Sequence, residues 1–247
     1  MSGEPRAPRR DLRPGHGGGR QSGRNPRGSP GRYTPAPPRA PRMKLLLASN
    51  NPKKLAELEL VLAPLELALV LPREIGGLPE VQEDQPSFAG NAAKKALSAA
   101  RHSGMWALAD DSGLVVEVLG GEPGVHSARY AGAHGDDAAN NARLLERLRG
   151  IPPERRDARF LCALALARPD GSLALQVQGS ARGRILEAPR GTHDFGYDPL
   201  FLFTEPGLRQ YGRGFAEMEP AEKAEVSHRG RALRELARRL PEVLRAL

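Results

Sequence analysis

The chain has 247 residues, which is enough for one large domain or two small ones, and it carries a formal charge of +8. Such a charge is typical of nucleic-acid-binding proteins, but its distribution excludes that function for most of the chain. Residues 1–42 hold ten of the 37 Lys and Arg residues and two of the 29 Asp and Glu residues, so residues 43–247 hold 27 of each and are neutral.

Residues 1–42 form a basic segment with nine Pro and eight Gly, and its large apolar side chains are Met1, Leu12 and Tyr33. So few apolar side chains do not offset the entropy lost on ordering, and we predict that the segment is disordered. Three interpretations stay open: a solvated appendage, an arm that binds nucleic acid or other anions weakly, or a misassigned start before Met43. The segment lacks the apolar core of a signal peptide.

Cys162 is the single cysteine and lies in the apolar run FLCALALA, which predicts a position in the core. One cysteine permits no disulfide within the chain, as expected in a reducing cytoplasm. No apolar run reaches the length that spans a bilayer. We therefore expect a cytoplasmic protein without a membrane partner.

Hydrophobic periodicity and turn residues predict alternating strands and helices, followed by a hairpin around the Pro-Asp-Gly turn at 169–171. Ser87 and Gly104 are the expected caps of the second helix. This order predicts an α/β protein with a mixed sheet. The expected strands cover residues 44–48, 66–72, 106–109, 113–119, 158–167 and 172–188, and the expected helices cover residues 53–65, 88–104, 136–150 and 227–247.

The segment SNNPKK (49–54) joins the first strand to the first helix. A helix N-terminus offers unpaired N–H groups and a partial positive charge, which suit a phosphate. Ser49, Asn51 and Lys54 add side-chain donors. The same residues also fit an ordinary helix start, and the segment is not a GxxxxGK[ST] loop.

Glu83, Asp110 and Asp111 are carboxylates from two separate segments. Oxygen ligands without accompanying Cys or His suit Mg²⁺ or Mn²⁺. Magnesium needs only one or two protein carboxylates, because it keeps several waters and shares substrate phosphates. The alternative is that the Asp pair has a role in a turn or a cap. Ser112 and Gly113, which follow directly, favour a tight turn and are compatible with both interpretations.

Two later segments contain groups suited to a nucleobase. In FGYDPLF (195–201), Phe195 could stack on a base and Gly196 allows close backbone approach. The alternative for Phe195 is a core aromatic.

In EKAEVSHRG (222–230), Lys223 is a phosphate candidate and Ser227 is the expected cap of the last helix. The cap places His228 and Arg229 in the first turn, where cations oppose the helix dipole, and this indicates that they face an acceptor. The alternative is a solvated basic turn.

Together these segments supply phosphate donors, a divalent-metal site, a stacking ring and donors for a base edge. That set is typical of a nucleoside triphosphate pocket. The chain has no GxSxG motif, no Ser-His-Asp set and no reactive thiolate site, so water is the expected nucleophile.

Five motifs occur in an order that resembles the inosine/xanthosine triphosphate pyrophosphatases: ASNNPKKLAEL, SFAGNAAKKA, ALADDSGLVVEVLGGEPGVHSARYAG, FGYDPLF and EKAEVSHRGRAL. The resemblance covers residues 43–247. It implies a homodimeric, Mg²⁺-dependent enzyme with an elongated mixed sheet flanked by helices and an active site in a cleft between two lobes. The implied activity is hydrolysis of ITP, dITP and XTP to the monophosphate and pyrophosphate, which keeps deaminated purines out of DNA and RNA.

The resemblance also assigns roles to residues. Asp111 matches the catalytic, metal-binding aspartate, and Glu83 matches a further metal ligand. The expected substrate contacts are Ser49, Asn50, Asn51, Pro52, Lys53, Lys54, Lys95, Ser112, Phe195, Gly196, Tyr197, Asp198, Lys223, His228 and Arg229. The chain departs from the family pattern at Gly90, where the family has Glu, and at His126, where Tyr is usual.

These roles imply a mechanism. We expect Lys54, Lys95 and Lys223 to neutralise phosphate oxygens while Asp111 orients or deprotonates a water that attacks the α-phosphorus. Asp110 is expected to fix the turn that aims Asp111.

We expect Arg229 and His228 to recognise the 6-keto oxygen of the base, because a 6-amino group would leave their donors unpaired.

Two alternative interpretations give the chain a different function. The chain could be a related pyrophosphatase acting on dTTP or UTP, or a nucleic-acid-binding protein that works through its arginine-rich tail.

Overall fold

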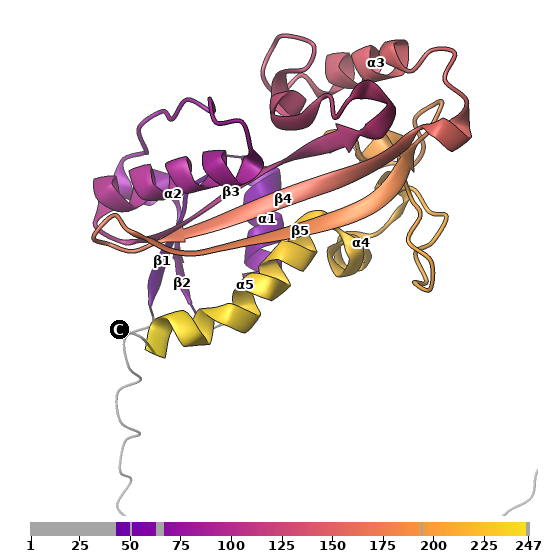
Figure 1. Cartoon of the computed structure of the whole chain (residues 1–247). Coiled ribbons are helices and arrows are strands. Elements are labelled where there is room, and N and C mark those ends of the chain that lie inside the picture. The colour runs from indigo at the N-terminus through magenta and orange to yellow at the C-terminus, as the bar shows by residue number, and fades with distance from the viewer. Residues whose placement is uncertain (1–42, 50, 63–66, 194, 246–247) are drawn as a thin grey trace, which may run out of the picture. The chain divides into compact units, whose positions relative to one another are not determined.

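The computed structural model describes residues 43–49, 51–62, 67–193 and 195–245. The prediction of disorder for residues 1–42 lies outside the described residues, as does Asn50. Within the described part, the α/β class and the mixed sheet are confirmed (Figure 1).

The described strands form one six-stranded sheet in the order β2-β1-β3-β4-β5-β6. β1 is parallel to both β2 and β3, and the pairs from β3 through β6 are antiparallel. β4 and β5 are the hairpin predicted around the Pro-Asp-Gly turn. The strands are β1 (Lys44–Leu47), β2 (Ala68–Val70), β3 (Trp106–Val116), β4 (Asp157–Ala167), β5 (Leu173–Ile185) and β6 (Phe201–Phe203).

Helices cover both faces of the sheet. The alanine-rich helix α2 packs on one face, whereas leucines of α1 and α5 pack on the other face (Figure 1). At the other end of β3–β5, α3 closes a separate core that contains Phe160, Phe201 and Phe215. The helices are α1 (Pro52–Leu62), α2 (Phe88–Ser103), α3 (Asp137–Arg147), α4 (Pro220–Val226) and α5 (His228–Arg245).

Helix caps were predicted correctly. The Ser87 hydroxyl accepts a hydrogen bond from the Gly90 amide at the start of α2, and Gly104 ends that helix with φ of 66°. Ser227 accepts from the Gly230 amide at 3.1 Å, so α5 begins at His228 as expected.

Two local predictions were wrong. β3 is one continuous strand, so the predicted turn at Asp110 and Asp111 does not form. β3 pairs with β4 from residue 107 to residue 116 without a break, and this ladder satisfies the backbone through the Asp pair. The segment 201–203, which lies outside all the expected strands and helices, forms the edge strand β6 against β5.

Cys162 is 1% exposed and packs in the core between the sheet and α5, as predicted. Burial raises the pKa of its thiol to about 12, so the sulfur stays protonated. Among the described residues, no helix is both long enough and apolar enough to cross a bilayer.

Candidate active site

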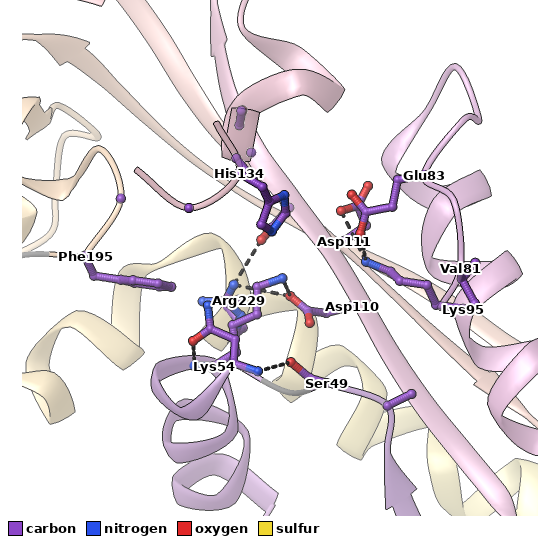
Figure 2. Close-up of a pocket in the computed structure, with 18 of the residues that line it drawn as sticks. Ser49, Lys54, Val81, Glu83, Lys95, Asp110, Asp111, His134, Phe195 and Arg229 are labelled. Atoms are coloured by element: carbon purple, nitrogen blue, oxygen red, sulfur yellow. Dashed lines mark hydrogen bonds and ion pairs between the residues drawn. The ribbon is translucent and has the colours of Figure 1, made fainter. Parts of the chain in front are cut away.

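A cavity of about 770 Å³ lies beside the middle of β3 (Figure 2). Its wall is built from the β1–α1 connection, the segment before α2, α2 itself and β3. Residues between 127 and 137, Phe160 of β4, the loop at 195–197 and the start of α5 complete it. Ser49, Asn51, Lys54, Glu83, Lys95, Asp111, Ser112, Phe195, Gly196, Tyr197, His228 and Arg229 are the predicted site residues that line it.

The cavity exists because one edge of β3 is left open. β1 pairs with β3 only from Trp106 to Leu108, and then the chain turns away into α1. Beyond Leu108, side chains from both faces of β3 can reach around the free edge. This arrangement brings the segments that were singled out in the sequence into one place.

Asp110 and Asp111 point to opposite faces of the sheet, because successive side chains of a strand alternate. Leu108, two residues before Asp110, packs with α1 and α5, whereas Ala109, two residues before Asp111, packs with α2. The role predicted for Asp110, a turn that aims its neighbour, is therefore wrong. Asp110 is instead a strand residue with its own charged partners.

On the α1 and α5 side, Asp110 lies between two cations. Its carboxylate is 3.0 Å from Lys54 Nζ and 3.3 Å from Arg229 Nη2, and its side chain is 1% exposed. Burial would raise the pKa of Asp110, but Lys54 and Arg229 outweigh burial and hold the pKa well below its usual range. Arg229 also donates to Ser112 Oγ at 2.9 Å.

Glu57 of α1 extends this network, although the sequence interpretation did not single it out. Its carboxylate pairs with Arg229 and lies 3.3 Å from Lys223 Nζ. Despite burial, Arg229 and Lys223 lower the pKa of Glu57. The spacing could have predicted this, because Glu57 lies three residues after Lys54 and therefore on the same face of the helix.

On the α2 side, Lys95 bridges two carboxylates. Its Nζ lies 2.8 Å from Glu83 Oε1 and 3.4 Å from Asp111 Oδ1 (Figure 2). Burial alone would lower the pKa of Lys95, but Asp110, Asp111 and Glu83 raise it above its usual value. Lys95 therefore stays charged, and a single cationic group holds Glu83 and Asp111 close together.

Burial is the main influence on the ionisation of Asp111. Burial raises the pKa of Asp111, and Glu83 adds to this rise, while Lys95 and a 3.1 Å hydrogen bond from Asn91 Nδ2 oppose it. Asn91 was not predicted, nor was Arg129, whose Nη2 donates to the Glu83 carbonyl at 3.0 Å. Arg129 thus ties the Glu83 segment to the loop after β3.

At the other end of the cavity, aromatic and donor groups face one another. His228 stacks on Phe160 at 4.6 Å between ring centroids, and the Arg229 guanidinium lies 5.7 Å from the ring of Phe195. His228 Nδ1 and Arg229 Nε are buried and have no hydrogen-bond partner among the described residues. Burial and the nearby Arg229 hold the pKa of His228 well below its usual value, so the ring is neutral.

Some predicted residues lie outside the cavity wall. Lys223 and Asp198 are not among the described residues that line the cavity. They are paired and buried behind it, with Lys223 Nζ 5.2 Å from the Phe195 ring. Lys223 therefore lies near the aromatic end, and the geometry does not favour its predicted contact with phosphate. Pro52 and Lys53 begin α1, next to the cavity residues Asn51 and Lys54.

Gly90, the departure from the family pattern, is not among the described residues that line the cavity. A Cβ at this position would meet Gln85 Cβ at 2.8 Å and Ser87 Oγ at 3.3 Å, both in the segment that begins α2. Gly90 is the third residue of that helix, where a Glu side chain completes a capping box with Ser87. Gly90 therefore lies at the start of the helix, while Glu83 and Asp111 line the cavity.

Comparisons with known proteins identify the family of this chain. The family model described as "Ham1 family" matches residues 45–239. The chain belongs to the Ham1 family. A curated Ham1 relative from Corynebacterium diphtheriae, named dITP/XTP pyrophosphatase, is 50% identical over 197 residues, which cover 78% of this chain and 95% of the relative. One from Desulforamulus reducens with the same name is 49% identical, covering 78% of this chain and 92% of the relative.

Solved structures show the Ham1 fold as well. A HAM1 protein from Coxiella burnetii superposes with a TM-score of 0.72 at 39% identity, covering 81% of this chain and 99% of that chain. A nucleoside-triphosphatase and dITP/XTP pyrophosphatase from Mycobacterium abscessus gives a TM-score of 0.63 at 48% identity, with coverage of 78% and 97%.

Proposed function

We propose that this chain hydrolyses dITP, ITP and XTP to the nucleoside monophosphate and pyrophosphate. One observation carries the proposal: a single cavity has a lysine and carboxylate cluster at one end and an aromatic wall with unpaired buried polar atoms at the other. A triphosphate fits the first end and a base fits the second. The curated relatives named dITP/XTP pyrophosphatase support the same activity.

Ser49, Asn51 and Lys54 support binding of the phosphates. They lie where β1 ends and α1 begins, so the N-terminal amides of α1 add to their positive potential. The Asn51 side chain accepts from the Lys54 amide at 3.3 Å, which fixes this start of the helix. Lys54 then neutralises phosphate oxygens while it stays close to Asp110.

Glu83 and Asp111 fit a divalent cation, for which Mg²⁺ is the first candidate and Mn²⁺ the second. Both carboxylates lie within 3.4 Å of one ammonium, which brings them near enough to share a cation. No group of three His, Cys, Asp or Glu side chains suited to a metal occurs in the described ranges. Two carboxylates suffice for magnesium, which when bound neutralises phosphate charge and polarises the phosphorus centre.

Asp111 is the residue we assign to the attacking water. Its carboxylate is held by Asn91 and Lys95, so its direction is fixed, and its raised pKa suits a group that accepts a proton. The water attacks the α-phosphorus in line, its proton passes to Asp111, and the bond to the pyrophosphate oxygen breaks. Lys54 and Lys95 offset the charge that develops on the phosphate oxygens.

Phe195, His228 and Arg229 form the site for the base. The ring of Phe195 offers a stacking surface. Arg229 Nε is a donor without a partner among the described residues, so it suits a 6-keto oxygen, whereas a 6-amino group leaves it unsatisfied. In the tautomer that carries the proton on Nδ1, His228 adds a second donor. This difference favours hypoxanthine and xanthine over adenine.

Release of pyrophosphate from a panel of dITP, ITP, XTP, GTP, ATP, dTTP and UTP, with and without Mg²⁺, tests the proposal. We expect Mg²⁺-dependent hydrolysis with the highest kcat/KM for the deaminated purines. Equal kcat/KM for ATP and ITP would refute recognition of the base. Preference for dTTP or UTP would favour the related pyrimidine enzyme instead.

Assembly as a homodimer and a cytoplasmic location are further parts of the proposal. The homodimer rests on the resemblance to inosine/xanthosine triphosphate pyrophosphatases. The cytoplasmic location rests on the single cysteine, which permits no disulfide within the chain. Light scattering on the purified protein and fractionation of the source cells test them.

A further inference from the structure

Helix α3 begins with DAANN, and two of these side chains hold the backbone of Gly196. Asp137 Oδ2 accepts a hydrogen bond from the Gly196 amide at 2.9 Å, and Asn141 Nδ2 donates to the Gly196 carbonyl at 2.8 Å. The two side chains lie four residues apart and so on one face of the helix. Both polar groups of a single peptide residue are thereby satisfied by one helix.

Gly196 lies in a tight turn between two residues of the cavity wall. Its φ is +57°, and the Asp198 amide donates to the Phe195 carbonyl at 3.1 Å to close the turn. A third contact fixes the same turn, because Tyr197 Oη donates to the Ser127 carbonyl at 2.8 Å. Phe195, which precedes Gly196, presents its ring to Arg229 and Lys223.

We infer that Asp137 and Asn141 are positioning residues for base recognition, which rests on the proposed function. They hold the turn so that Phe195 faces the base site opposite His228 and Arg229. Asp137 also lines the cavity, so its hydrogen bond to Gly196 lies next to the proposed site. Losing either contact frees the turn and weakens base binding without removing a group that acts on the α-phosphorus.

The helix dipole does not account for this pair. The acid at the helix cap is Asp136, whose Oδ1 accepts from the Ala139 amide at 2.9 Å. Asn141 carries no charge and lies in the second turn. Its neighbour Asn140 accepts from the Ala131 amide at 2.7 Å, so adjacent side chains of α3 hold two different loops of the cavity wall.

The experiment compares the wild-type chain with Asp137→Ala, Asn141→Asp and the conservative Asp137→Asn. A carboxylate at 141 has no hydrogen to donate to the Gly196 carbonyl, whereas an amide at 137 still accepts from the Gly196 amide. The control is Glu146→Gln, an exposed carboxylate-to-amide change on the same helix. The measurements are KM and kcat for dITP, thermal unfolding, and hydrogen exchange of the peptide that contains Phe195–Tyr197.

We expect Asp137→Ala and Asn141→Asp to raise KM about tenfold, the size of one lost hydrogen bond to a polar or charged partner. They should change kcat by less than about threefold and speed exchange of the 195–197 peptide at an unchanged unfolding temperature. Asp137→Asn and Glu146→Gln should behave like the wild type.

The inference is overturned if both disruptive variants keep the wild-type KM and exchange rate. It is also overturned if they lower kcat and the unfolding temperature together, as a general loss of structure would. If the wild-type chain turns over no nucleotide, the proposed function fails, and the exchange of the 195–197 peptide still decides whether the two side chains hold the turn.

Discussion

Asp110 and Asp111 are consecutive residues of β3, yet they bind different lysines on opposite faces of the sheet. Asp110 lies 3.0 Å from Lys54, and Asp111 lies 3.4 Å from Lys95. The pKa of Asp110 is lowered by Lys54 and Arg229, whereas burial raises the pKa of Asp111. Two identical side chains thus have opposite electrostatic environments, and substitutions at the two positions should have opposite consequences.

Asp111→Asn should abolish turnover while the fold stays intact. An amide of the same shape keeps the packing but accepts no proton, and loss of a general base costs about 10²–10⁴ in rate. Pyrophosphate release from dITP measures the effect, and circular dichroism checks the fold. The matched control is Asp84→Asn, because Asp84 is half-exposed and pairs with Lys94 outside the cavity wall. Near-wild-type turnover by Asp111→Asn would contradict the assignment.

Asp110→Asn should destabilise the protein. It removes the charge that neutralises buried Arg229 and the nearby Lys54, and breaking a buried ion pair costs about 3 kcal/mol of unfolding free energy. Asp111→Asn should leave the unfolding free energy equal or higher, because its ionised form is already disfavoured by burial. Urea unfolding of both variants measures the contrast. Equal destabilisation by the two substitutions would rule out the opposite environments.

The difference in stability between the wild type and Asp110→Asn should depend on pH. Because the folded pKa of Asp110 is below its ordinary value of 3.8, its contribution is fully present above 3.8 and is lost as the pH falls through the folded value. The difference between the two urea curves should therefore be constant above about pH 5 and should shrink progressively as the pH falls below 3.8 toward the folded pKa. A difference that grows on acidification would show that Lys54 and Arg229 do not stabilise the ionised carboxylate.

A chain that begins at Met43 should keep its hydrolytic activity. The described cavity is built entirely from residues after Met43, and the charge of residues 43–247 is balanced. Comparing kcat/KM for dITP in the two chains measures this, and DNA binding at rising salt measures the anion affinity of residues 1–42. Loss of hydrolysis on deletion, together with salt-dependent DNA binding by the full chain, would favour the nucleic-acid-binding alternative.

Several features of the fold follow from local sequence because their causes are local. Ser87 and Gly104 bound α2 through contacts within one turn of the helix, and the turn at 169–171 sets the hairpin of β4 and β5. The order of motifs likewise indicated Glu83, Asp111 and Lys95, which the fold brings together. Glu57 shares a helix face with Lys54, so its place in the network was accessible from spacing alone.

Other features depend on partners distant in the chain. A pair of aspartates between short apolar runs is typical of a turn. Only the pairing with β4 shows that the strand continues through Asp110 and Asp111. The same ladder places Asp110 and Asp111 on opposite faces, where Arg229 and Lys95 meet them from sequence distances of 119 and 16 residues. The hydrogen bonds of Asp137 and Asn141 to Gly196 also join residues more than 50 positions apart in the sequence. The sequence by itself determined which chemical groups the protein has and where its elements begin and end, because caps, turns and periodicity act over a few residues. The tertiary structure decided which charge faces which partner, because a side chain's direction and pKa depend on the elements packed against it.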